Sequence, residues 1–402
     1  MVRNQVSSTS LDDQLEELLS ESVEDARTRE SSAFDERTAG SGGAFVLFGA
    51  GSLGRKTANG MRNLGIEPIA LADSNPELWD TSVDGVPVMS PQEAIRRHGR
   101  TAAFITTIWR GSSAGRQSDR VSQLRDIGCR TVVPFGYLYW KYPEEFLPHW
   151  SLSLPHRILE NADDLRTLWS LWGDEDSRRE FIAQLRFRLW IDYHALRTPT
   201  EHAQYFADDL FALSAREVFI DCGAFDGDTI REFIRRRGSS FTAIRAYEPD
   251  ERNFLRLQGS IAELGASISG KVTIRQLAVG AEFSSVGFVS EGSIASRVDL
   301  DGDALVACVP LDGDLAGLRP TYIKMDIEGF EMNALLGARE TIRANRPILA
   351  VCVYHKPEDL REVPLLINSL SDAYRYFLRS HDEEGWELVV YAVPSGRLVR
   401  SQ

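Results

Sequence analysis

The sequence predicts an α/β protein with two doubly wound domains: a small sheet in the N-terminal half and a larger sheet in the C-terminal half that ends in an antiparallel hairpin. Two stretches support this prediction, because in each of them short apolar runs alternate with segments of helical periodicity and the first run ends in a glycine turn. The length of 402 residues allows two or three domains, and a hydrophobic content of 43% supplies their cores.

Composition narrows the classes of protein that the chain represents. Forty-five Lys and Arg residues against 59 Asp and Glu residues give a net charge of −14, which repels a phosphate backbone, so we expect no nucleic-acid partner. No stretch approaches the roughly 18 apolar residues of a membrane span, and the polar N-terminus lacks the apolar core of a secretory signal. The four cysteines form no Cys-x-x-Cys pair, as is typical of a reducing compartment. We therefore expect a cytoplasmic protein without a membrane partner.

Residues 1–43 differ in composition from the rest of the chain. They are rich in Ser, Glu, Asp and Arg and end in a run of Gly and Ser, which predicts a flexible segment. Leu11, Leu15, Leu18 and Leu19 recur at helical spacing, so a short docking helix is the alternative.

Residues 44–140 predict the first domain, a small Rossmann-like sheet. Its strands are expected at residues 45–48, 69–73, 102–108 and 131–133, with a helix that ends near residue 64. The turn of Gly49, Gly51 and Gly54, with Asp73 after the second strand, fits a dinucleotide fingerprint in which glycines approach phosphates and the carboxylate binds a ribose. Neither a second mononucleotide-binding half nor a hydride-transfer group follows. Nucleotide or acceptor binding, a structural or dimerising role, and an active NAD site therefore all remain open.

Residues 141–213 predict a helical connector. Strand signals are absent there, and large apolar residues recur at steps of three and four, namely Trp169, Trp172, Phe181, Leu185, Leu189 and Trp190. We interpret these side chains as core or interdomain packing rather than as a substrate platform.

Residues 214–402 predict the second, larger sheet. Its strands are expected at residues 218–223, 243–248, 272–279, 322–326 and 348–354, followed by a hairpin of residues 374–378 and 386–391. In such a sheet a ligand lies beyond the carboxyl ends of the strands, at the switch in strand order. The residues that follow strands one, two and four are therefore the strongest candidates for contact with a ligand.

Acidic side chains occupy these strand ends. The first turn carries Asp221, Asp226 and Asp228, and the second strand ends in Glu248, which is placed to accept hydrogen bonds from a ribose diol. A pyrophosphate would meet like charges there at a cost on the order of several kcal/mol. S-adenosylmethionine carries an ammonium and a sulfonium centre beside its ribose, so the charge pattern favours this cofactor. Each aspartate taken alone is equally well explained as a helix cap or turn residue.

A third charged element follows in residues 322–331. Lys324, Asp326 and Glu328 alternate with apolar residues, which predicts a strand with these three side chains on one side. Buried charges are costly unless they are paired, so these must pair with one another, with solvent or with a ligand. Their place at the carboxyl end of a strand favours a ligand site, and a purely structural ion-pair cluster is the alternative.

Five segments together resemble the FkbM family of S-adenosylmethionine-dependent methyltransferases, over roughly residues 204–359. They are residues 221–229, 248–250 with Asn253, 277–280, 310–312, and the motif Lys324-x-Asp326-x-Glu328-Gly329-x-Glu331, which is the most specific of them. The resemblance implies a seven-stranded methyltransferase sheet and the methylation of a hydroxyl, often on a sugar, polyketide or similar metabolite. In the first domain, residues 73–76 and 85–91 more weakly resemble small Rossmann-like domains of sugar-modifying enzymes.

The resemblance also assigns residues to the cofactor by position. It places Asp221, Gly223, Gly227 and Asp228 at the methionine end, Glu248 at the ribose, and Ala278 and Val279 at the adenine. The expected cofactor-binding set also includes Ala224, Phe225, Thr229, Pro249 and Asn253. The pair Phe225-Asp226 departs from the commonest form of the family, which carries Asn and an aliphatic residue there, and Asp226 is left without a role.

Methyl transfer to a hydroxyl requires a base that removes its proton as the new bond forms. The resemblance places Asp326 and Glu328 toward the methyl group and the acceptor, and either serves as the base if burial raises its pKa. His355 follows the strand at residues 348–354 and is the third candidate, because its ordinary pKa lies near neutrality. Lys324 completes the predicted catalytic set. No second His stands near these carboxylates in the sequence, so we predict no metal ion, and a divalent ion held by the carboxylates is the alternative.

These observations predict an S-adenosylmethionine-dependent O-methyltransferase of a sugar or secondary metabolite. Its partner is expected to be a small hydroxyl acceptor such as a sugar or nucleotide-sugar, and a homodimer is compatible with the sequence. The alternatives are an NAD-dependent oxidoreductase centred on Gly49 and Asp73, and a non-catalytic nucleotide-binding protein that uses the same turn.

Overall fold

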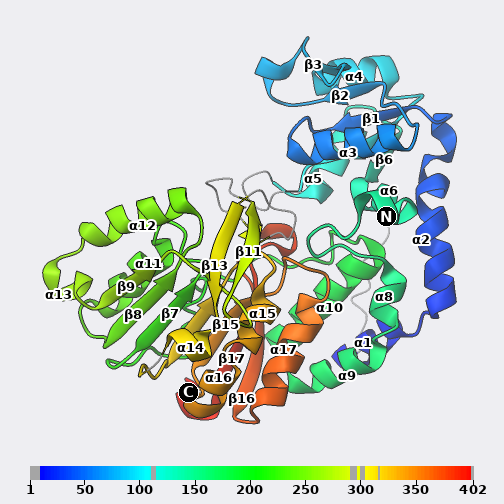
Figure 1. Cartoon of the computed structure of the whole chain (residues 1–402). Coiled ribbons are helices and arrows are strands. Elements are labelled where there is room, and N and C mark those ends of the chain that lie inside the picture. The colour runs from blue at the N-terminus through cyan, green and yellow to red at the C-terminus, as the bar shows by residue number, and fades with distance from the viewer. Residues whose placement is uncertain (1–9, 110–114, 290–296, 299–303, 316, 400–402) are drawn as a thin grey trace. The chain divides into compact units, whose positions relative to one another are not determined.

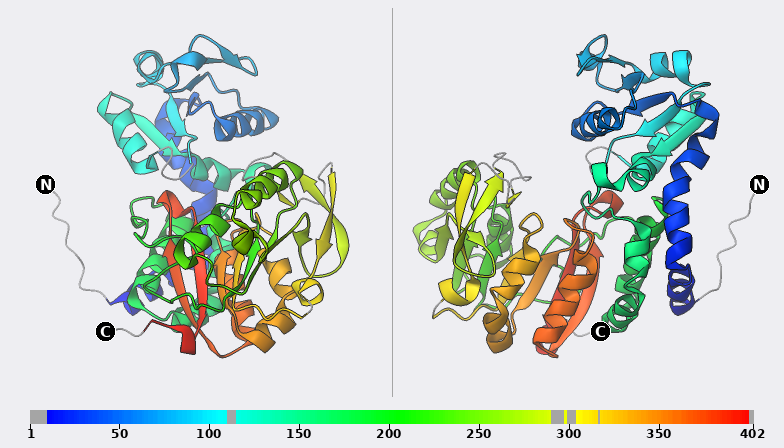
Figure 2. Two further views of the ribbon diagram at one scale, coloured as in Figure 1. Left: turned by 90° about the vertical axis from the view of Figure 1, so that its left-hand side faces the viewer. Right: turned by 45° about the vertical axis from the view of Figure 1, so that its right-hand side comes forward.

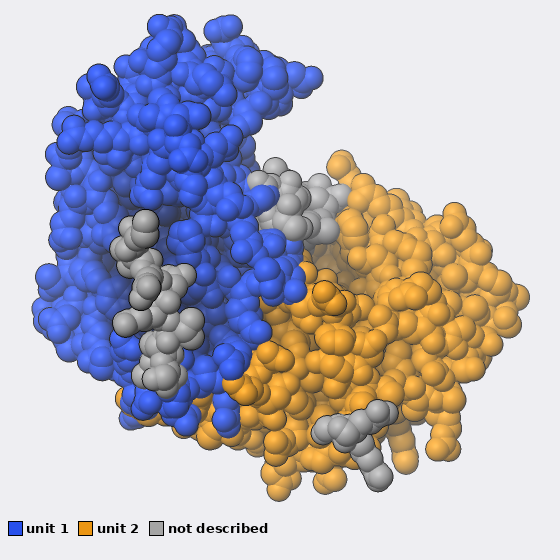
Figure 3. All heavy atoms as spheres, turned by 180° about the vertical axis from the view of Figure 1, so that it is seen from behind, with its two compact units in different colours: residues 1–163, 178–199, 382–386 blue, residues 164–177, 200–381, 387–402 orange. Residues whose placement is uncertain are grey.

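The computed structural model describes residues 10–109, 115–289, 297–298, 304–315 and 317–399. They form two compact units, which Figure 3 shows in different colours. Unit 1 comprises Met1–Asp163, Arg178–Pro199 and Asp382–Trp386, and unit 2 comprises Asp164–Ser177, Thr200–His381 and Glu387–Gln402. This division differs from the boundaries expected at residues 43, 140 and 213, because pieces of the connector belong to both units and the tip of the C-terminal hairpin belongs to unit 1.

Unit 1 contains a six-stranded sheet in the order β3-β4-β2-β1-β5-β6. Its strands are β1 (Phe45–Phe48), β2 (Ala70–Ala72), β3 (Ser82–Val83), β4 (Val86–Met89), β5 (Ala103–Thr106) and β6 (Thr131–Pro134). All neighbours pair in parallel except β3 with β4. Every residue of β1, β2 and β5 is buried, which explains their continuous apolar runs. The predicted N-terminal sheet is confirmed.

Short helices follow the strands of unit 1 (Figure 1). They are α3 (Ser52–Asn63), α4 (Pro91–His98), α5 (Gln117–Asp126), α6 (Phe135–Lys141), α7 (Pro143–Phe146) and α8 (Pro155–Leu159). Two further helices, α9 (Ala162–Leu171) and α10 (Glu175–Trp190), each contain residues of both units. Residues 191–217, all of which are described, contain no helix, so the helical part of the expected connector ends at Trp190. No helix in the described chain combines the length and apolar character that crossing a bilayer requires.

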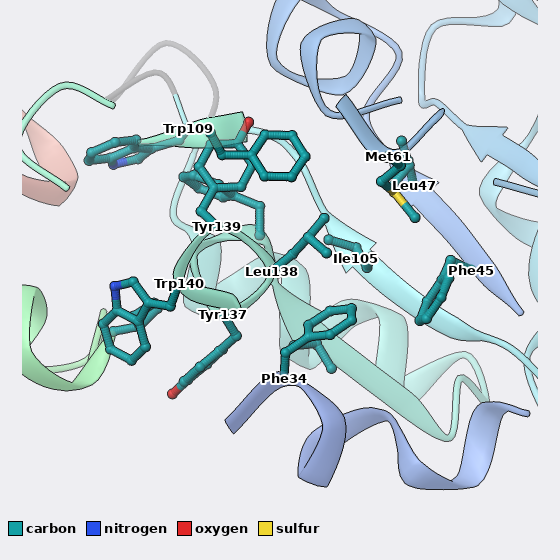
Figure 4. Packing of buried hydrophobic residues seen from close by; sticks show 14 of the residues in the cluster. Phe34, Phe45, Leu47, Met61, Ile105, Trp109, Tyr137, Leu138, Tyr139 and Trp140 are labelled. Atoms are coloured by element: carbon teal, nitrogen blue, oxygen red, sulfur yellow. The ribbon is translucent and has the colours of Figure 1, made fainter. Parts of the chain in front are cut away.

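The N-terminal segment differs from the expected flexible segment. It forms α1 (Leu11–Leu19) and α2 (Val23–Thr38). Serine side chains cap both helices: that of Ser10 accepts a hydrogen bond from the backbone of Asp13, and that of Ser22 from the backbone of Asp25. Phe34 of α2 is buried with its ring centroid 5.6 Å from that of Phe45 in β1 (Figure 4). Although the segment is polar in composition, α2 has a narrow apolar face that packs in the core of unit 1.

Unit 2 contains a seven-stranded sheet in the order β16-β17-β15-β14-β7-β8-β9 (Figures 1 and 2). Its strands are β7 (Val218–Cys222), β8 (Ala243–Tyr247), β9 (Val272–Arg275), β14 (Tyr322–Met325), β15 (Ile348–Cys352), β16 (Tyr374–Ser380) and β17 (Leu388–Pro394). The helices are α11 (Asp228–Arg237), α12 (Glu251–Ala262), α13 (Ala266–Ser269), α14 (Leu311–Asp314), α15 (Glu331–Leu336), α16 (Arg339–Asn345) and α17 (Asp359–Leu370). In this sheet β15, β14, β7, β8 and β9 pair in parallel with their neighbours, and the terminal hairpin of β16 and β17 is antiparallel, as predicted.

A second, four-stranded sheet in unit 2 was not expected from the sequence. It has the order β10-β13-β11-β12, with β10 (Ala278–Val279), β11 (Ser284–Val289), β12 (Arg297–Val298) and β13 (Ala304–Val309). The prediction of a single strand over residues 272–279 is therefore wrong. The chain leaves the large sheet after Arg275 and enters the four-stranded sheet at Ala278. Figure 1 shows β11 and β13 as the paired yellow strands.

The core role of α2 gives a stability prediction. We expect Phe34→Ala to lower the free energy of unfolding by about 3–5 kcal/mol, because it removes a buried ring and leaves a cavity. Ser31→Ala, on the exposed side of the same helix, is the matched control and should change stability by less than about 0.5 kcal/mol. Urea unfolding followed by circular dichroism measures both. Equal stabilities of the two variants would show that α2 is not part of the core.

Candidate functional site

A pocket of about 170 Å³ lies in unit 2 where the carboxyl ends of β7, β8 and β14 meet. The predicted residues that line it are Gly223, Phe225, Asp228, Thr229, Glu248, Pro249, Asn253, Ala278, Val279, Lys324, Asp326 and Glu328. Neighbouring strands end side by side at this edge, so residues from distant parts of the sequence converge on one cavity.

A buried ion pair lies at the base of this pocket. Lys324 and Asp221 are register partners on the adjacent strands β14 and β7, with Nζ 3.3 Å from Oδ1 and exposed side-chain fractions of 2% and 0%. The Lys324 ammonium also donates a hydrogen bond to the carbonyl of Gly223 at 2.6 Å. Burial alone would lower the pKa of Lys324, but the carboxylates of Asp221, Asp326 and Asp228 raise it instead. Asp221 was expected at the methionine end, but it lies outside the lining of the pocket and holds Lys324.

The turn after β7 makes close backbone contact with the turn after β14. Gly223 has φ +84°, and a Cβ there would lie 1.8 Å from the carbonyl oxygen of Asp326. Only glycine permits both this conformation and this approach. Two other predicted residues of the turn, Ala224 and Gly227, lie outside the pocket lining, and Gly227 instead starts α11 with φ +88°.

Glu248 is a buried carboxyl group at the end of β8. Its Oε2 accepts a hydrogen bond from the backbone of Phe225 at 2.8 Å and its Oε1 one from the backbone of Asp250 at 2.9 Å. Burial raises the pKa of Glu248 to about 7, and the two backbone donors oppose that rise. The side chain is therefore fixed in place, with lone pairs of both oxygens left for a ligand that carries hydroxyl groups.

Asp326 and Glu328 lie in the turn after β14 rather than in a strand. The expected alternation over residues 322–328 is wrong, because β14 ends at Met325 and Glu328 has φ +56°. Asp326 Oδ2 accepts a hydrogen bond from the Tyr205 hydroxyl at 2.8 Å, and its Oδ1 lies 3.3 Å from His355 Nε2. Burial would raise the pKa of Asp326, but Lys324 and His355 lower it. Burial raises the pKa of Glu328 to about 8.

His355 lies behind the pocket, between carboxylates. Its Nδ1 is 2.8 Å from Glu331 Oε1, and its Nε2 is 3.3 Å from Asp326 Oδ1 and 3.8 Å from Glu328 Oε1. Burial would lower the pKa of His355, but Glu331, Glu328 and Asp326 raise it to about 10. Asp326, Glu331 and His355 are close enough to share a metal ion. The imidazolium already supplies a positive charge at that point, and it does not line the pocket as the predicted base should.

The sequence did not assign a role to several side chains that line the pocket. They are Gln204, Tyr205, Tyr247, Leu277, Phe288, Ile327, Phe330, Tyr354 and Glu387. Gln204 and Tyr205 stand at the start of the segment that resembles the FkbM family, and Tyr354 precedes His355, so these positions carried a usable signal. Phe288 belongs to the unexpected sheet, and Glu387 follows the hairpin tip, where no motif marks it. Asp226 is outside the lining and pairs with Arg231 at 2.8 Å.

The four residues of the second candidate site come together in unit 1. Gly49 has φ +119°, and a Cβ on Gly54 would lie 1.8 Å from the carbonyl oxygen of Gly49. Asp73 Oδ2 accepts a hydrogen bond from the backbone of Ala50 at 2.7 Å, and its Oδ1 accepts one from the backbone of Asn75 at 2.8 Å. Steric fit thus explains why glycine stands at positions 49 and 54, and the hydrogen bonds that stabilise the turn explain why an aspartate stands at position 73. Neither explanation requires a bound nucleotide.

Comparison with known proteins agrees with the site's place in the fold. Residues 221–383 match the family model of the methyltransferase FkbM domain. The solved structure of methyltransferase FkbM from Methylobacillus flagellatus KT superimposes with a TM-score of 0.76 at 22% sequence identity, covering 95% of this chain and 99% of that one. No curated protein sequence matches the chain. The family match identifies residues 221–383 as a methyltransferase domain. Residues 221–383 belong to the FkbM methyltransferase family, as the sequence motifs indicate.

Two further solved structures align over part of the chain. Precorrin-6y C5,15-methyltransferase from Geobacter metallireducens GS-15 has a TM-score of 0.29 and 11% identity, and the alignment covers 46% of this chain and 84% of that one. UDP-D-quinovosamine 4-dehydrogenase from Vibrio fischeri has a TM-score of 0.19 and 21% identity, and the alignment covers 23% of this chain and 75% of that one. Both scores are too low to support an argument about this chain.

The contact between the two turns gives a prediction with a close control. We expect Gly223→Ala to destabilise unit 2 by at least about 2 kcal/mol more than Gly238→Ala. Both glycines have positive φ, but a Cβ on Gly238 meets nothing within 4 Å, whereas one on Gly223 collides with the backbone of Asp326. Urea unfolding measures the difference. Equal losses would mean that the turns separate without cost.

Glu328 gives a prediction on pH and stability. Its pKa is about 8 in the folded protein against an ordinary value of 4.5, so the folded state retains a proton that the unfolded state releases between these values. The contribution of Glu328 to stability therefore falls as pH rises from 5 to 8. Glu328→Gln cannot ionise, so its Tm relative to wild type should rise over this range by roughly 3 °C or more. The exposed control Glu251→Gln should show a constant difference, and a constant difference for Glu328→Gln would contradict the burial argument.

Proposed function

We propose that the pocket of unit 2 binds S-adenosylmethionine and directs its methyl group to a hydroxyl of a small molecule, such as a sugar or secondary metabolite. Membership of residues 221–383 in the FkbM methyltransferase family supports the reaction class. The position of Glu248 carries the cofactor assignment, because it is a fixed carboxyl group at the end of the second strand of the sheet, beside the glycine turn.

The charge of the lining fits this cofactor. Among the described residues that line the pocket, Lys324 is the one cation, and it is already paired with Asp221. Five carboxyl groups line the same pocket, namely Asp228, Glu248, Asp326, Glu328 and Glu387. A phosphate group would meet the ionised carboxylate of Asp326 with no free cation to offset it. An ammonium or sulfonium centre would be attracted to that carboxylate and would favour the ionised form of the carboxyl groups whose pKa burial raises, such as Glu248 and Glu328.

S-adenosylmethionine supplies an electrophilic methyl group when it is bound, and the protein supplies the position and the proton acceptor. Asp326 stays ionised because Lys324 and His355 lower its pKa, so it is suited to orient an acceptor hydroxyl. Glu328 lines the same part of the pocket and has a pKa of about 8, close to the value that makes a general base effective near neutral pH. We assign it as the base. His355, as an imidazolium, positions both carboxylates.

Cofactor binding tests the first half of this proposal. We expect wild-type protein to bind S-adenosylmethionine in calorimetric titration, and Glu248→Gln to bind it at least about tenfold more weakly, since an amide cannot accept from both backbone donors. The exposed control Glu251→Gln, at the start of α12, should bind like wild type. Binding of NAD in place of S-adenosylmethionine would reverse the cofactor assignment.

Turnover tests the second half. Metabolite extracts incubated with the protein and cofactor should yield products heavier by one methyl group, detected by mass spectrometry. With such an acceptor, kcat should rise with pH around an apparent pKa near 8, and Glu328→Gln should lower kcat by about 10²–10⁴-fold and remove this dependence while cofactor affinity is retained. An unchanged pH profile in Glu328→Gln would exclude Glu328 as the base.

A further inference from the structure

A second pocket lies wholly within unit 1. It encloses about 350 Å³ and is lined by parts of α2, α5, β6 and α6 and by residues 191–194. None of Gly49, Gly51, Gly54 and Asp73 lines it, so it is distinct from the glycine turn that the sequence suggested as a nucleotide site. It also belongs to a different unit from the pocket of unit 2, so it is independent of the function proposed for that pocket.

Three arginines from separate elements line this pocket. Arg37 comes from α2, Arg125 from α5, and Arg130 from the turn before β6. Within the part of the chain that the structure describes, no carboxylate lies within 4.0 Å of any of the three, although the chain has 59 acidic residues against 45 basic ones. Acidic residues outnumber basic ones in this chain, so three arginines without a carboxylate partner in one pocket are a distinctive feature of unit 1.

The remaining polar groups leave these arginines available to a ligand. Arg37 stacks over the ring of Tyr137 at 4.0 Å and donates to the carbonyl of Ala33 at 3.4 Å, which fixes its plane and leaves other N–H groups unused. Asp192 is the one carboxylate among the described lining residues. Its Oδ1 accepts from the backbone of His194 at 3.1 Å, and its Oδ2 lies 3.7 Å from Arg186 Nε.

We propose that this pocket binds a phosphorylated small molecule. Guanidinium groups match phosphate oxygens with paired hydrogen bonds, and three of them on one hollow offset the two to three negative charges of a phosphate ester or pyrophosphate. Ser118 and Thr131 line the same pocket, and a hydroxyl side chain is a hydrogen-bond donor suited to a phosphate oxygen. The volume suits a small molecule, and the net charge of −14 opposes a polymeric phosphate.

Titration of the full-length protein with inorganic pyrophosphate tests this proposal. Calorimetry should give one site per chain, and Arg125→Gln and Arg130→Gln should each weaken binding by about tenfold or more. Arg100→Gln is the matched control, because Arg100 is an exposed arginine of unit 1 that also lacks a carboxylate partner but lies outside the pocket. The Arg100→Gln variant should bind pyrophosphate like the wild type. Thermal unfolding should be the same for all three variants, since all three positions are exposed.

Three results would overturn the proposal. They are the absence of pyrophosphate binding, wild-type affinity in both pocket variants, and an equal loss of affinity in Arg100→Gln, which would indicate attraction by overall charge alone. Citrate, a carboxylate anion of comparable charge, separates phosphate recognition from general anion binding. Citrate that binds as tightly as pyrophosphate would also contradict the proposal.

Discussion

The ion pair of Lys324 and Asp221 is the constraint on which the site in unit 2 depends. It joins the two central strands of the large sheet at register partners, where burial is nearly complete. Removing one partner would leave an uncompensated buried charge, which costs about 3–5 kcal/mol in comparable cases. Because the ammonium also binds the carbonyl of Gly223, the same pair fixes the turn that borders the pocket. The contact between Lys324 and Asp221 thus fixes both the position of this turn and the charge balance beside it.

That contact also divides the remaining carboxyl groups into two kinds. Asp326 lies 4.0 Å from Lys324 and 3.3 Å from His355, so it stays ionised in a buried place. Burial raises the pKa of Glu328 and of Glu387, to about 8 and about 7, because no cation close to them outweighs their loss of solvent. Neighbouring carboxyl groups with pKa values that are pushed apart are able to take different roles, one as a fixed charge and one as a proton acceptor.

The sequence predicted the residues at strand ends well and the residues in unusual turns poorly. Largely apolar runs located β7, β8 and β15, and the alternation of Lys324 with apolar residues located β14. The parallel topology then brought Gly223, Glu248 and Asp326 to one edge. Periodicity failed at Glu328, because a positive φ ends the alternation that a strand would continue. It also missed Glu387, which reaches the pocket only through the pairing of β15 with β17. Contacts set by tertiary pairing of this kind leave no local pattern in the sequence.

The two glycine turns show why a fingerprint does not identify a ligand. In both units a carboxylate after the second strand accepts a hydrogen bond from the turn that follows the first strand: Asp73 from Ala50 at 2.7 Å, and Glu248 from Phe225 at 2.8 Å. In both, a glycine avoids a collision at 1.8 Å with a carbonyl oxygen, which belongs to Gly49 of the same turn in unit 1 and to Asp326 of the neighbouring turn in unit 2. The spacing between the glycine turn and the carboxylate, which both units share, is therefore explained by the packing of a turn against a sheet. What separates the two turns is burial and charge. Glu248 lines a pocket with four other carboxyl groups, whereas the unpaired arginines of unit 1 lie elsewhere, so a negatively charged ligand in unit 1 should follow the arginines rather than the glycines.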